Sequence, residues 1–287
     1  MFLFIPTSSW SLLMFATFPT GLSSHRATQL PYTQKSILYY AAKPSAEPVF
    51  NHPSVGISVP EIARQVSVRI LTNSGSGSGV IIERRGETYT VLTNHHVVED
   101  GSDNYYTVLS ADGQMHSARW LRSVQFGTLD LALVQFTSDQ DYKVVAFGNP
   151  NTLSVGDSVY AAGFPSWHFI KEGNTITALE DTRNWGVRAF RLTTGTVGMF
   201  AERSLQGGYQ LGYTNDVVQG MSGGPVLNQN GELIGINGKS KYPLGGIEAF
   251  IFANGMMPSE KQFLQMEALS WAIPITNFQP RFGQIGK

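Results

Sequence analysis

The sequence predicts an all-β protein, a sandwich or a barrel with few helices. Short apolar and β-branched runs recur along the chain, with turn residues between them, and segments with helical periodicity are rare. Hydrophobic residues make up 42% of the 287 residues, which is enough to bury one large core or two medium ones. We therefore expect a globular protein.

Two N-terminal stretches precede the expected folded part. Residues 1–24 carry no charged side chain and are most apolar between Leu12 and Phe18, which favours a signal or leader segment and export. No Lys or Arg precedes that run and no A-x-A site follows it, so a degenerate leader or a misplaced start is the alternative. A polar interruption at 7–9 argues against a stable membrane span. Residues 25–58 are rich in proline and are expected to form a linker or propeptide-like region.

The folded part is expected to begin near Pro60 with a short helical turn. Turn residues at 84–86, at 111–113 and at Asn230 and Gly231 indicate hairpins. The glycine-rich segment 75–79 lacks the spacing of a nucleotide-binding loop, which excludes that function. The expected strands of the first half lie at 65–71, 81–83, 88–93, 105–110, 114–120 and 129–136. After the break at Gly148 to Pro150, further strands are expected at 226–227 and 233–236.

The segment 220–226 places Ser222 among glycines, where a nucleophile could be presented to a substrate. Its G-x-S-x-G pattern is also that of an α/β hydrolase, but that fold needs a histidine after the serine. All six histidines precede Ser222, so an α/β-hydrolase esterase is excluded. A subtilisin-like order would leave only His116 and His168 as weak candidates for the base. The order that remains is His, Asp, Ser.

Two runs supply the candidates for the base and its partner. Residues 91–98 read as a strand that delivers His95 and His96 to the rim of a sheet. Adjacent histidines on an extended chain point to opposite faces and seldom hold one metal ion. Asp130 stands at the head of the apolar run 129–136, where a carboxylate needs a partner.

These motifs resemble those of the trypsin-like serine peptidases, most closely the bacterial HtrA/Deg type. The shared motifs are G-S-G-V-I-I at 77–82, T-N-x-H-V-V at 93–98, D-L-A-L-V at 130–134 and the serine segment at 220–224. The resemblance covers roughly residues 62–276. It implies two six-stranded antiparallel β-barrels, the first at 59–148 and the second at 149–287. An insertion at about 240–268 departs from the Deg relatives, and a helix is expected at 259–267 with Phe263, Leu264 and Met266 packed on the barrel.

The resemblance also implies a serine endopeptidase with polypeptide substrates. His96 would be the general base, with His95 as the weaker alternative, Asp130 would orient it, and Ser222 would be the nucleophile. The amides of Gly220 and Ser222 would form the oxyanion hole. The alternative function is a catalytically silent or chaperone-like binding module on the same fold.

Three features bear on regulation and specificity. Met221 occupies the position where animal trypsins hold the aspartate of their activation salt bridge, so we expect no activation of that kind. Only 12 residues follow Ile275 in this sequence, and no PDZ-length segment is expected. Asp216, six residues before Ser222, would favour Lys or Arg at the cleaved position, although it also reads as an ordinary turn residue. The expected cleft wall includes Asn237 and Gly238.

Composition limits the remaining partners. The net charge is −1 and no basic cluster occurs, so we expect no binding to nucleic acid. The chain has no cysteine, which excludes disulfides and thiolate metal sites. We expect no metal and no cofactor. The sequence gives no indication of the oligomeric state.

Overall fold

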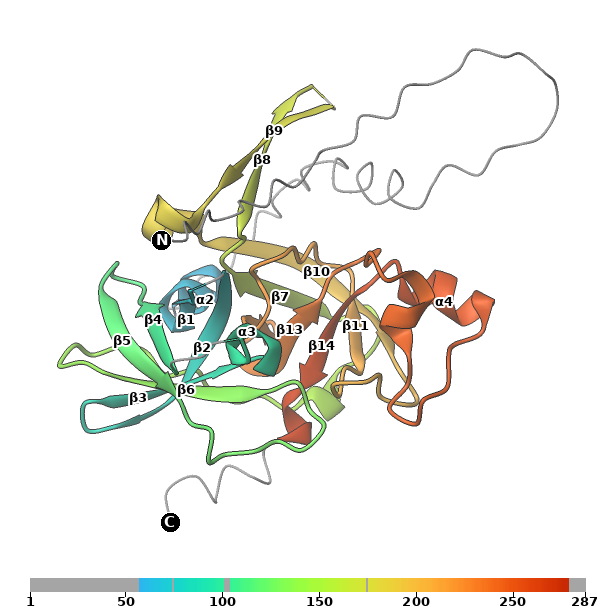
Figure 1. Cartoon of the computed structure of the whole chain (residues 1–287). Helices are drawn as coiled ribbons and strands as arrows, with labels where there is room; N and C mark the ends of the chain where they lie inside the picture. The colour runs from blue at the N-terminus through green and yellow to red at the C-terminus, as the bar shows by residue number, and fades with distance from the viewer. Residues whose placement is uncertain (1–56, 74, 101–103, 174, 279–287) are drawn as a thin grey trace, which may run out of the picture. The chain divides into compact units, whose positions relative to one another are not determined.

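A computed structural model describes residues 57–278, except 74, 101–103 and 174. Within this part the chain forms two closed barrels of six strands each, in the orders β1-β2-β3-β6-β5-β4 and β10-β11-β14-β13-β12-β7 (Figure 1). Neighbouring strands run antiparallel. The predicted all-β double barrel is confirmed. The expected leader and most of the expected linker lie outside the described residues.

The first barrel follows a short helix, α2 (Val59–Val66), which has Pro60 in its first turn as expected. Both predicted hairpins of this barrel are present, one formed by β2 and β3 and one by β4 and β5. A four-residue helix, α3 (His95–Val98), follows β3 directly. The strands are β1 (Ser67–Leu71), β2 (Ser76–Arg85), β3 (Thr88–Thr93), β4 (Tyr105–Leu109), β5 (Met115–Trp120) and β6 (Ala132–Thr137).

The second barrel contains the hairpin of β12 and β13 across Gly231, which has a positive φ of 75°. Short 3₁₀ helices stand before, between or after its strands: η1 (Pro150–Thr152), η2 (Arg183–Ala189), η3 (Gly246–Phe250) and η4 (Ile275–Asn277). The strands are β7 (Ser158–Gly163), β10 (Arg191–Phe200), β11 (Leu211–Tyr213), β12 (Pro225–Leu227), β13 (Leu233–Lys239) and β14 (Ser270–Pro274).

Strand periodicity explains how the two barrels are joined. Successive side chains of a strand point to opposite faces. In β3, Val91 therefore packs inside the first barrel, whereas Leu92 packs in a larger cluster that also contains Ile236 and Trp271 of the second barrel. Both Val91 and Leu92 are fully buried, so both faces of the strand are covered at this point. A separate cluster around Val226 and Ile234 fills the second barrel.

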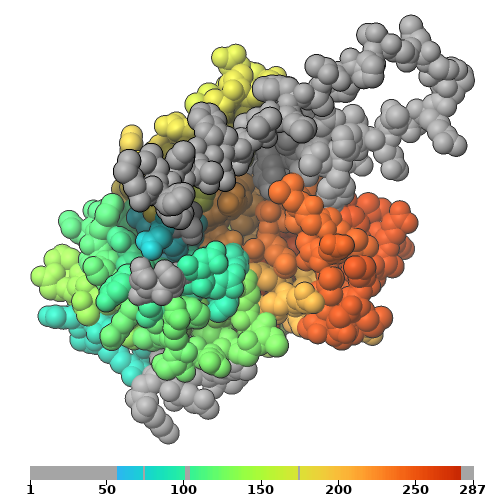
Figure 2. Space-filling view, in the orientation of Figure 1, coloured from blue at the N-terminus to red at the C-terminus, as the bar shows by residue number. Residues whose placement is uncertain are grey.

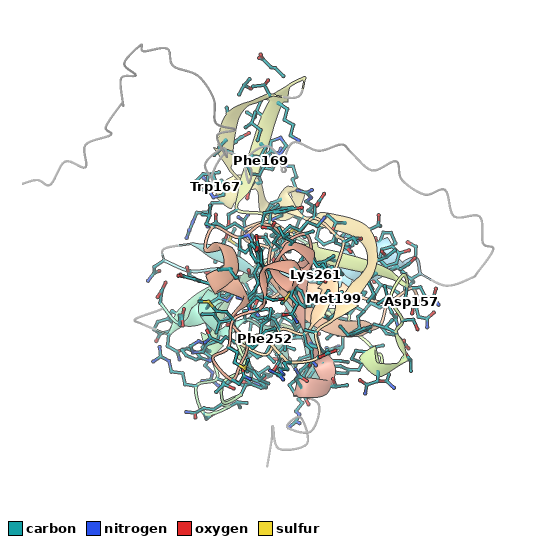
Figure 3. All side chains as sticks on the ribbon, turned by 90° about the vertical axis from the view of Figure 1, so that its right-hand side faces the viewer. Asp157, Trp167, Phe169, Met199, Phe252 and Lys261 are labelled. Carbon is teal, nitrogen blue, oxygen red and sulfur yellow. The ribbon has the colours of Figure 1, made fainter. Side chains whose placement is uncertain are left out.

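A third sheet was not predicted. Strands β8 (Trp167–Glu172) and β9 (Thr175–Asp181) pair with each other and project from the second barrel (Figure 1). Most of their residues are exposed, including Trp167 and Leu179. Figure 3 shows Trp167 and Phe169 on this hairpin, well separated from Met199 and Phe252. Because the hairpin buries little apolar surface, its sequence lacks the alternation that signals a half-buried strand.

The insertion contains the predicted helix, α4 (Glu260–Met266), in the orange part of Figure 2. Its N-cap is Ser259, whose hydroxyl accepts a hydrogen bond from the Gln262 amide in a capping box. Met266 is buried and Phe263 packs against the same cluster, as expected. Leu264 was expected to pack there too, but it is exposed. Residues 263 and 266 share one helix face, and residue 264 faces away from it.

Among the described residues, no helix has both the length and the apolar character needed to cross a membrane.

Candidate active site

His96 and Asp130 meet because their strands are neighbours in the first barrel. β3 ends at Thr93, which pairs with Ala132 at the start of β6. Residues that follow β3 and residues that precede β6 therefore lie at the same end of the sheet. His96 Nδ1 lies 2.6 Å from Asp130 Oδ2, and the His96 amide donates to Asp130 Oδ1 at 3.0 Å. The side-chain amide of Asn94 donates to the Asp130 carbonyl at 2.8 Å.

The two histidines separate in a way that the sequence did not indicate. The chain was expected to stay extended through them, but it turns into α3 immediately after Asn94. His95 Nδ1 lies 3.1 Å from Glu99 Oε2, and its ring meets the Trp120 ring edge-on with centroids 5.2 Å apart. His96, and not His95, is the histidine that contacts Asp130.

Asp130 is held as a carboxylate. Its side chain is only 18% exposed, and burial alone would raise its pKa. The hydrogen bond and charge of His96, with a further hydrogen bond from the Tyr209 hydroxyl, outweigh burial and lower the pKa of Asp130 below its usual value. A charged carboxylate at this position can accept a hydrogen bond from the imidazole N–H of His96 without becoming protonated.

Ser222 reaches this end of the first barrel from the second barrel. The Ser78 amide in β2 donates to the Ser222 carbonyl at 2.8 Å. The next residue, Gly223, has a φ of 85°, and a Cβ there would lie 2.2 Å from Thr93 Oγ1 and 3.1 Å from the Asn94 amide nitrogen. Only glycine allows this approach. The serine loop is therefore packed against the residues that lead into His96.

The Ser222 side chain is half-buried, and within the described part of the chain its hydroxyl has no hydrogen-bond partner. Hydrogen bonds between a nucleophile and its base are often long without substrate and shorten when substrate is bound.

The amides of the serine loop fall into two groups. Those of Met221, Gly223 and Gly224 donate to backbone carbonyls. Those of Gly220 and Ser222 have no acceptor among the residues that the structure describes. Two neighbouring free amides of this kind can bind the negatively charged oxygen of a reacting carbonyl.

The orientation of the Gly220 amide is fixed from behind. In a trans peptide the N–H and the preceding carbonyl point in opposite directions. The Gln219 carbonyl accepts a hydrogen bond from the Ser166 amide at 2.9 Å, so the Gly220 N–H must point the other way. Gly220 has a φ of 93°, and a Cβ there would lie 2.4 Å from the Ser166 nitrogen. Glycine is thus required at this position by both conformation and space.

Two buried residues of the first barrel hold this region, and sequence reasoning gave them no role. The Ser78 hydroxyl donates to the Gly220 carbonyl at 2.7 Å and accepts from the Phe164 amide at 2.8 Å. The fully buried Arg69 donates to the carbonyl and the hydroxyl of Thr182, at 2.7 Å and 3.0 Å. Thr182 in turn donates its amide to the Ser166 carbonyl at 3.1 Å.

Met221 is fully buried in the apolar core of the second barrel. A charged side chain at this position would be buried among apolar residues, which is costly without a polar partner.

The structure does not bring the three residues predicted to bind substrate into one cluster. Asp216 is 51% exposed and forms an ion pair with Lys241 at 2.8 Å. Asn237 is fully buried, and its amide donates to the Ala162 carbonyl and accepts from the Tyr213 hydroxyl. Gly238 packs against Tyr209, which donates a hydrogen bond to Asp130.

A hollow of about 510 Å³ lies beside the site. It is lined by His95, Asp130 and the loop between β5 and β6. In the described part of the chain, no three His, Asp or Glu side chains are grouped so that they could hold a metal ion.

The trypsin-like peptidase domain family matches residues 77–236, which is more than half of the chain. "Serine protease Do-like HtrA" of Bacillus subtilis (strain 168) is 30% identical over 203 residues, covering 67% of this chain and 40% of the relative. "Probable periplasmic serine protease do/HhoA-like" of Haemophilus influenzae is 36% identical over 180 residues, covering 62% and 34%. "Probable periplasmic serine endoprotease DegP-like" of Bartonella henselae is 31% identical over 183 residues, covering 62% and 30%. The chain thus spans less than half the length of each of these relatives.

Proposed function

The chain belongs to the trypsin-like peptidase family, related to the HtrA and DegP-like serine proteases, and from this we propose that it is a serine endopeptidase. The observation that carries the proposal is the hydrogen bond between His96 Nδ1 and Asp130 Oδ2, which lie 2.6 Å apart. Beside this pair lies the loop of Ser222, with two backbone amides that have no acceptor among the described residues. Polypeptides are the proposed substrates. No metal or cofactor enters the reaction that we propose.

In the proposed mechanism, His96 accepts the hydroxyl proton of Ser222 as the serine oxygen attacks a peptide carbonyl. Asp130 holds the tautomer of His96 that has its proton on Nδ1, so that Nε2 is free to act as the base. The amides of Gly220 and Ser222 bind the developing oxyanion, each contributing about 3–4 kcal/mol to the transition state. His96 then gives the proton to the leaving amine. Water, deprotonated by His96, hydrolyses the acyl-enzyme and frees Ser222.

The test is hydrolysis of an unfolded protein, such as dye-labelled casein, by the wild-type chain and by Ser222→Ala. We expect the substitution to lower kcat about 10⁶-fold, because the nucleophile is lost. Thr137→Ala, at the exposed end of β6, is the matched control and should retain the wild-type rate. Equal turnover by wild type and Ser222→Ala would refute the proposal. A wild-type chain that binds unfolded protein without cleaving it would instead support the silent or chaperone-like alternative.

The primary specificity is proposed from Asp216. Its carboxylate would select Lys or Arg at the cleaved position, and its ion pair with Lys241 would have to open first. A peptide-library profile of the wild type and of Asp216→Asn measures this directly. A basic preference that disappears in the variant supports the proposal, and a wild-type profile without Lys or Arg contradicts it.

Export is proposed from the apolar segment 1–24 and from relatives that are named periplasmic. Cell fractionation of the native protein tests this proposal, and recovery in the cytoplasmic fraction alone would contradict it.

A further inference from the structure

We propose that Tyr209, a residue of the second barrel, is a positioning residue of the triad whose hydroxyl holds Asp130, and through it His96, in the reactive orientation. The proposal rests on the peptidase function proposed above. It concerns a residue that no sequence motif singled out.

The contact with Asp130 is direct. The Tyr209 hydroxyl donates to Asp130 Oδ2, the same oxygen that lies 2.6 Å from His96 Nδ1. The other carboxylate oxygen, Oδ1, accepts from the His96 amide. Both oxygens are therefore occupied, and the carboxylate cannot rotate without breaking one of these hydrogen bonds. Charge-assisted hydrogen bonds of this kind are about twice as strong as neutral ones.

The space for the tyrosine is reserved by Gly238. A Cβ at residue 238 would lie 2.1 Å from the Tyr209 hydroxyl oxygen and 2.3 Å from its Cε1. Any larger residue there would push the hydroxyl away from Asp130. The Lys239 ammonium group lies 4.9 Å from the centre of the Tyr209 ring and covers one of its faces. Tyr209 itself is only 3% exposed.

The tyrosine remains a donor throughout the working pH range. Burial raises the pKa of the Tyr209 hydroxyl well above its usual value, and the neighbouring Asp130 charge raises it further. The hydroxyl therefore keeps its proton at neutral pH, where the Asp130 carboxylate is charged.

The same contact ties the two halves of the site together. Asp130 and His96 precede β6 and follow β3 in the first barrel, whereas Tyr209 precedes β11 in the second. A backbone hydrogen bond also joins these two segments: the Asp130 amide donates to the Gly207 carbonyl at 2.9 Å. Ser222 also belongs to the second barrel, so Tyr209 fixes the base and its partner relative to the barrel that carries the nucleophile.

The first test compares the steady-state kinetics of wild type and Tyr209→Phe on dye-labelled casein. We expect kcat to fall by up to about 10²-fold, the loss that a displacement of a catalytic group by about 1 Å can cause. KM should stay unchanged, because Tyr209 does not touch the substrate in the proposed mechanism. Tyr89→Phe is the matched control: Tyr89 is fully buried in the first barrel and donates to the Gln140 carbonyl at 2.6 Å. A Tyr209→Phe variant as active as the Tyr89→Phe control would overturn the proposal.

The second test does not need activity. In the full chain carrying Ser222→Ala, the proton between His96 and Asp130 should give a far-downfield proton NMR signal, since the two atoms are 2.6 Å apart. Adding Tyr209→Phe frees Asp130 Oδ2 from its second donor, and we expect the signal to move further downfield. Adding Tyr89→Phe should leave it in place.

The two tests separate the proposal from the function on which it rests. A wild-type chain without turnover, but with a signal that moves in Tyr209→Phe, refutes the peptidase function and supports the tyrosine's role. An active wild type whose signal is unmoved by Tyr209→Phe refutes the tyrosine's role and leaves the function standing. Loss of kcat with an unmoved signal would mean that the hydroxyl acts only through packing, which also contradicts the proposal.

Discussion

The carboxylate of Asp130 accepts more hydrogen bonds than any other side chain described at the site. Three donors reach it: the His96 ring, the His96 amide and the Tyr209 hydroxyl. An asparagine at this position would present an amide that can donate to His96 Nδ1 and favour the wrong tautomer. We expect Asp130→Asn to lower kcat about 10⁴-fold, the loss seen for this substitution in serine proteases. Casein hydrolysis measures it, and a variant within tenfold of wild type would contradict the role given to Asp130.

The lowered pKa of Asp130 also predicts how stability depends on pH. A carboxyl group whose pKa is lower in the folded than in the unfolded state contributes stability above its unfolded value of about 3.9. That contribution is lost as the pH falls through the folded-state pKa. The measurement therefore compares urea unfolding of Ser222→Ala with and without Asp130→Asn. The chain with the aspartate should lose stability relative to the chain with the asparagine as the pH falls below about 5 and on through the lowered pKa of Asp130. A difference that is constant with pH would contradict this account.

At the residue scale, chain order and motif resemblance predicted Asp130 and the pairing of His96 with it. They could not predict Tyr209, because 79 positions separate it from Asp130 and no motif accompanies it. The side chain of Asn237 is buried and hydrogen-bonded inside the barrel, and the predicted contact of this residue with substrate stays a prediction. The residues around Asn237 in β13 do not indicate from the sequence alone whether its side chain faces the barrel interior or the substrate.

At the scale of elements, the base of the β8–β9 hairpin connects the first barrel to the serine loop, whose amides we propose bind the oxyanion. Arg69 of β1 binds Thr182, Thr182 binds Ser166, and Ser166 holds the Gln219 carbonyl. The amide of Gly220, which we propose binds the oxyanion, is thereby oriented without a charged residue at position 221.

This strap, the chain of bonds from Arg69 through Thr182 to Ser166, gives a prediction of its own. Thr182→Val keeps the shape of the side chain but removes the hydroxyl that accepts from Arg69 and donates to the Pro165 carbonyl. The guanidinium group is then left with an unpaired donor, and we expect kcat to fall about tenfold with KM unchanged. Thr182→Ser restores the hydroxyl and should restore kcat. If both variants turn over substrate like wild type, the strap does not set the oxyanion hole.

Elements with a strong local sequence signal could be predicted, and the parts that form the strap could not. The strands around 88–93 and 114–120 and the helix at 259–267 have strong local signals, and the structure contains all three. The β8–β9 hairpin buries too little apolar surface to produce such a local signal. Arg69 lies within an apolar strand, and its partner is 113 positions away, so nothing local indicates that a buried charge belongs there.

At the scale of the whole molecule, the site exists only where the two barrels meet. His96 and Asp130 come from the first barrel, and Ser222 and the free amides of Gly220 and Ser222 come from the second. Leu92 of the first barrel and Trp271 of the second share one apolar cluster, which fixes the barrels to each other. The order of His, Asp and Ser along the chain predicted this division, but the hydrogen bonds that align the two halves depend on the fold.

The central claim is that Ser222 is a nucleophile activated by His96. The most direct measurement is labelling of the native chain by a fluorophosphonate, with the modified residue identified by mass spectrometry. We predict a single label on Ser222 in the wild type, labelling that is lost in Ser222→Ala and strongly slowed in His96→Ala, and wild-type labelling in His95→Ala, which changes the neighbouring imidazole. A folded wild-type chain that remains unlabelled, or that is labelled at another residue, would contradict the account.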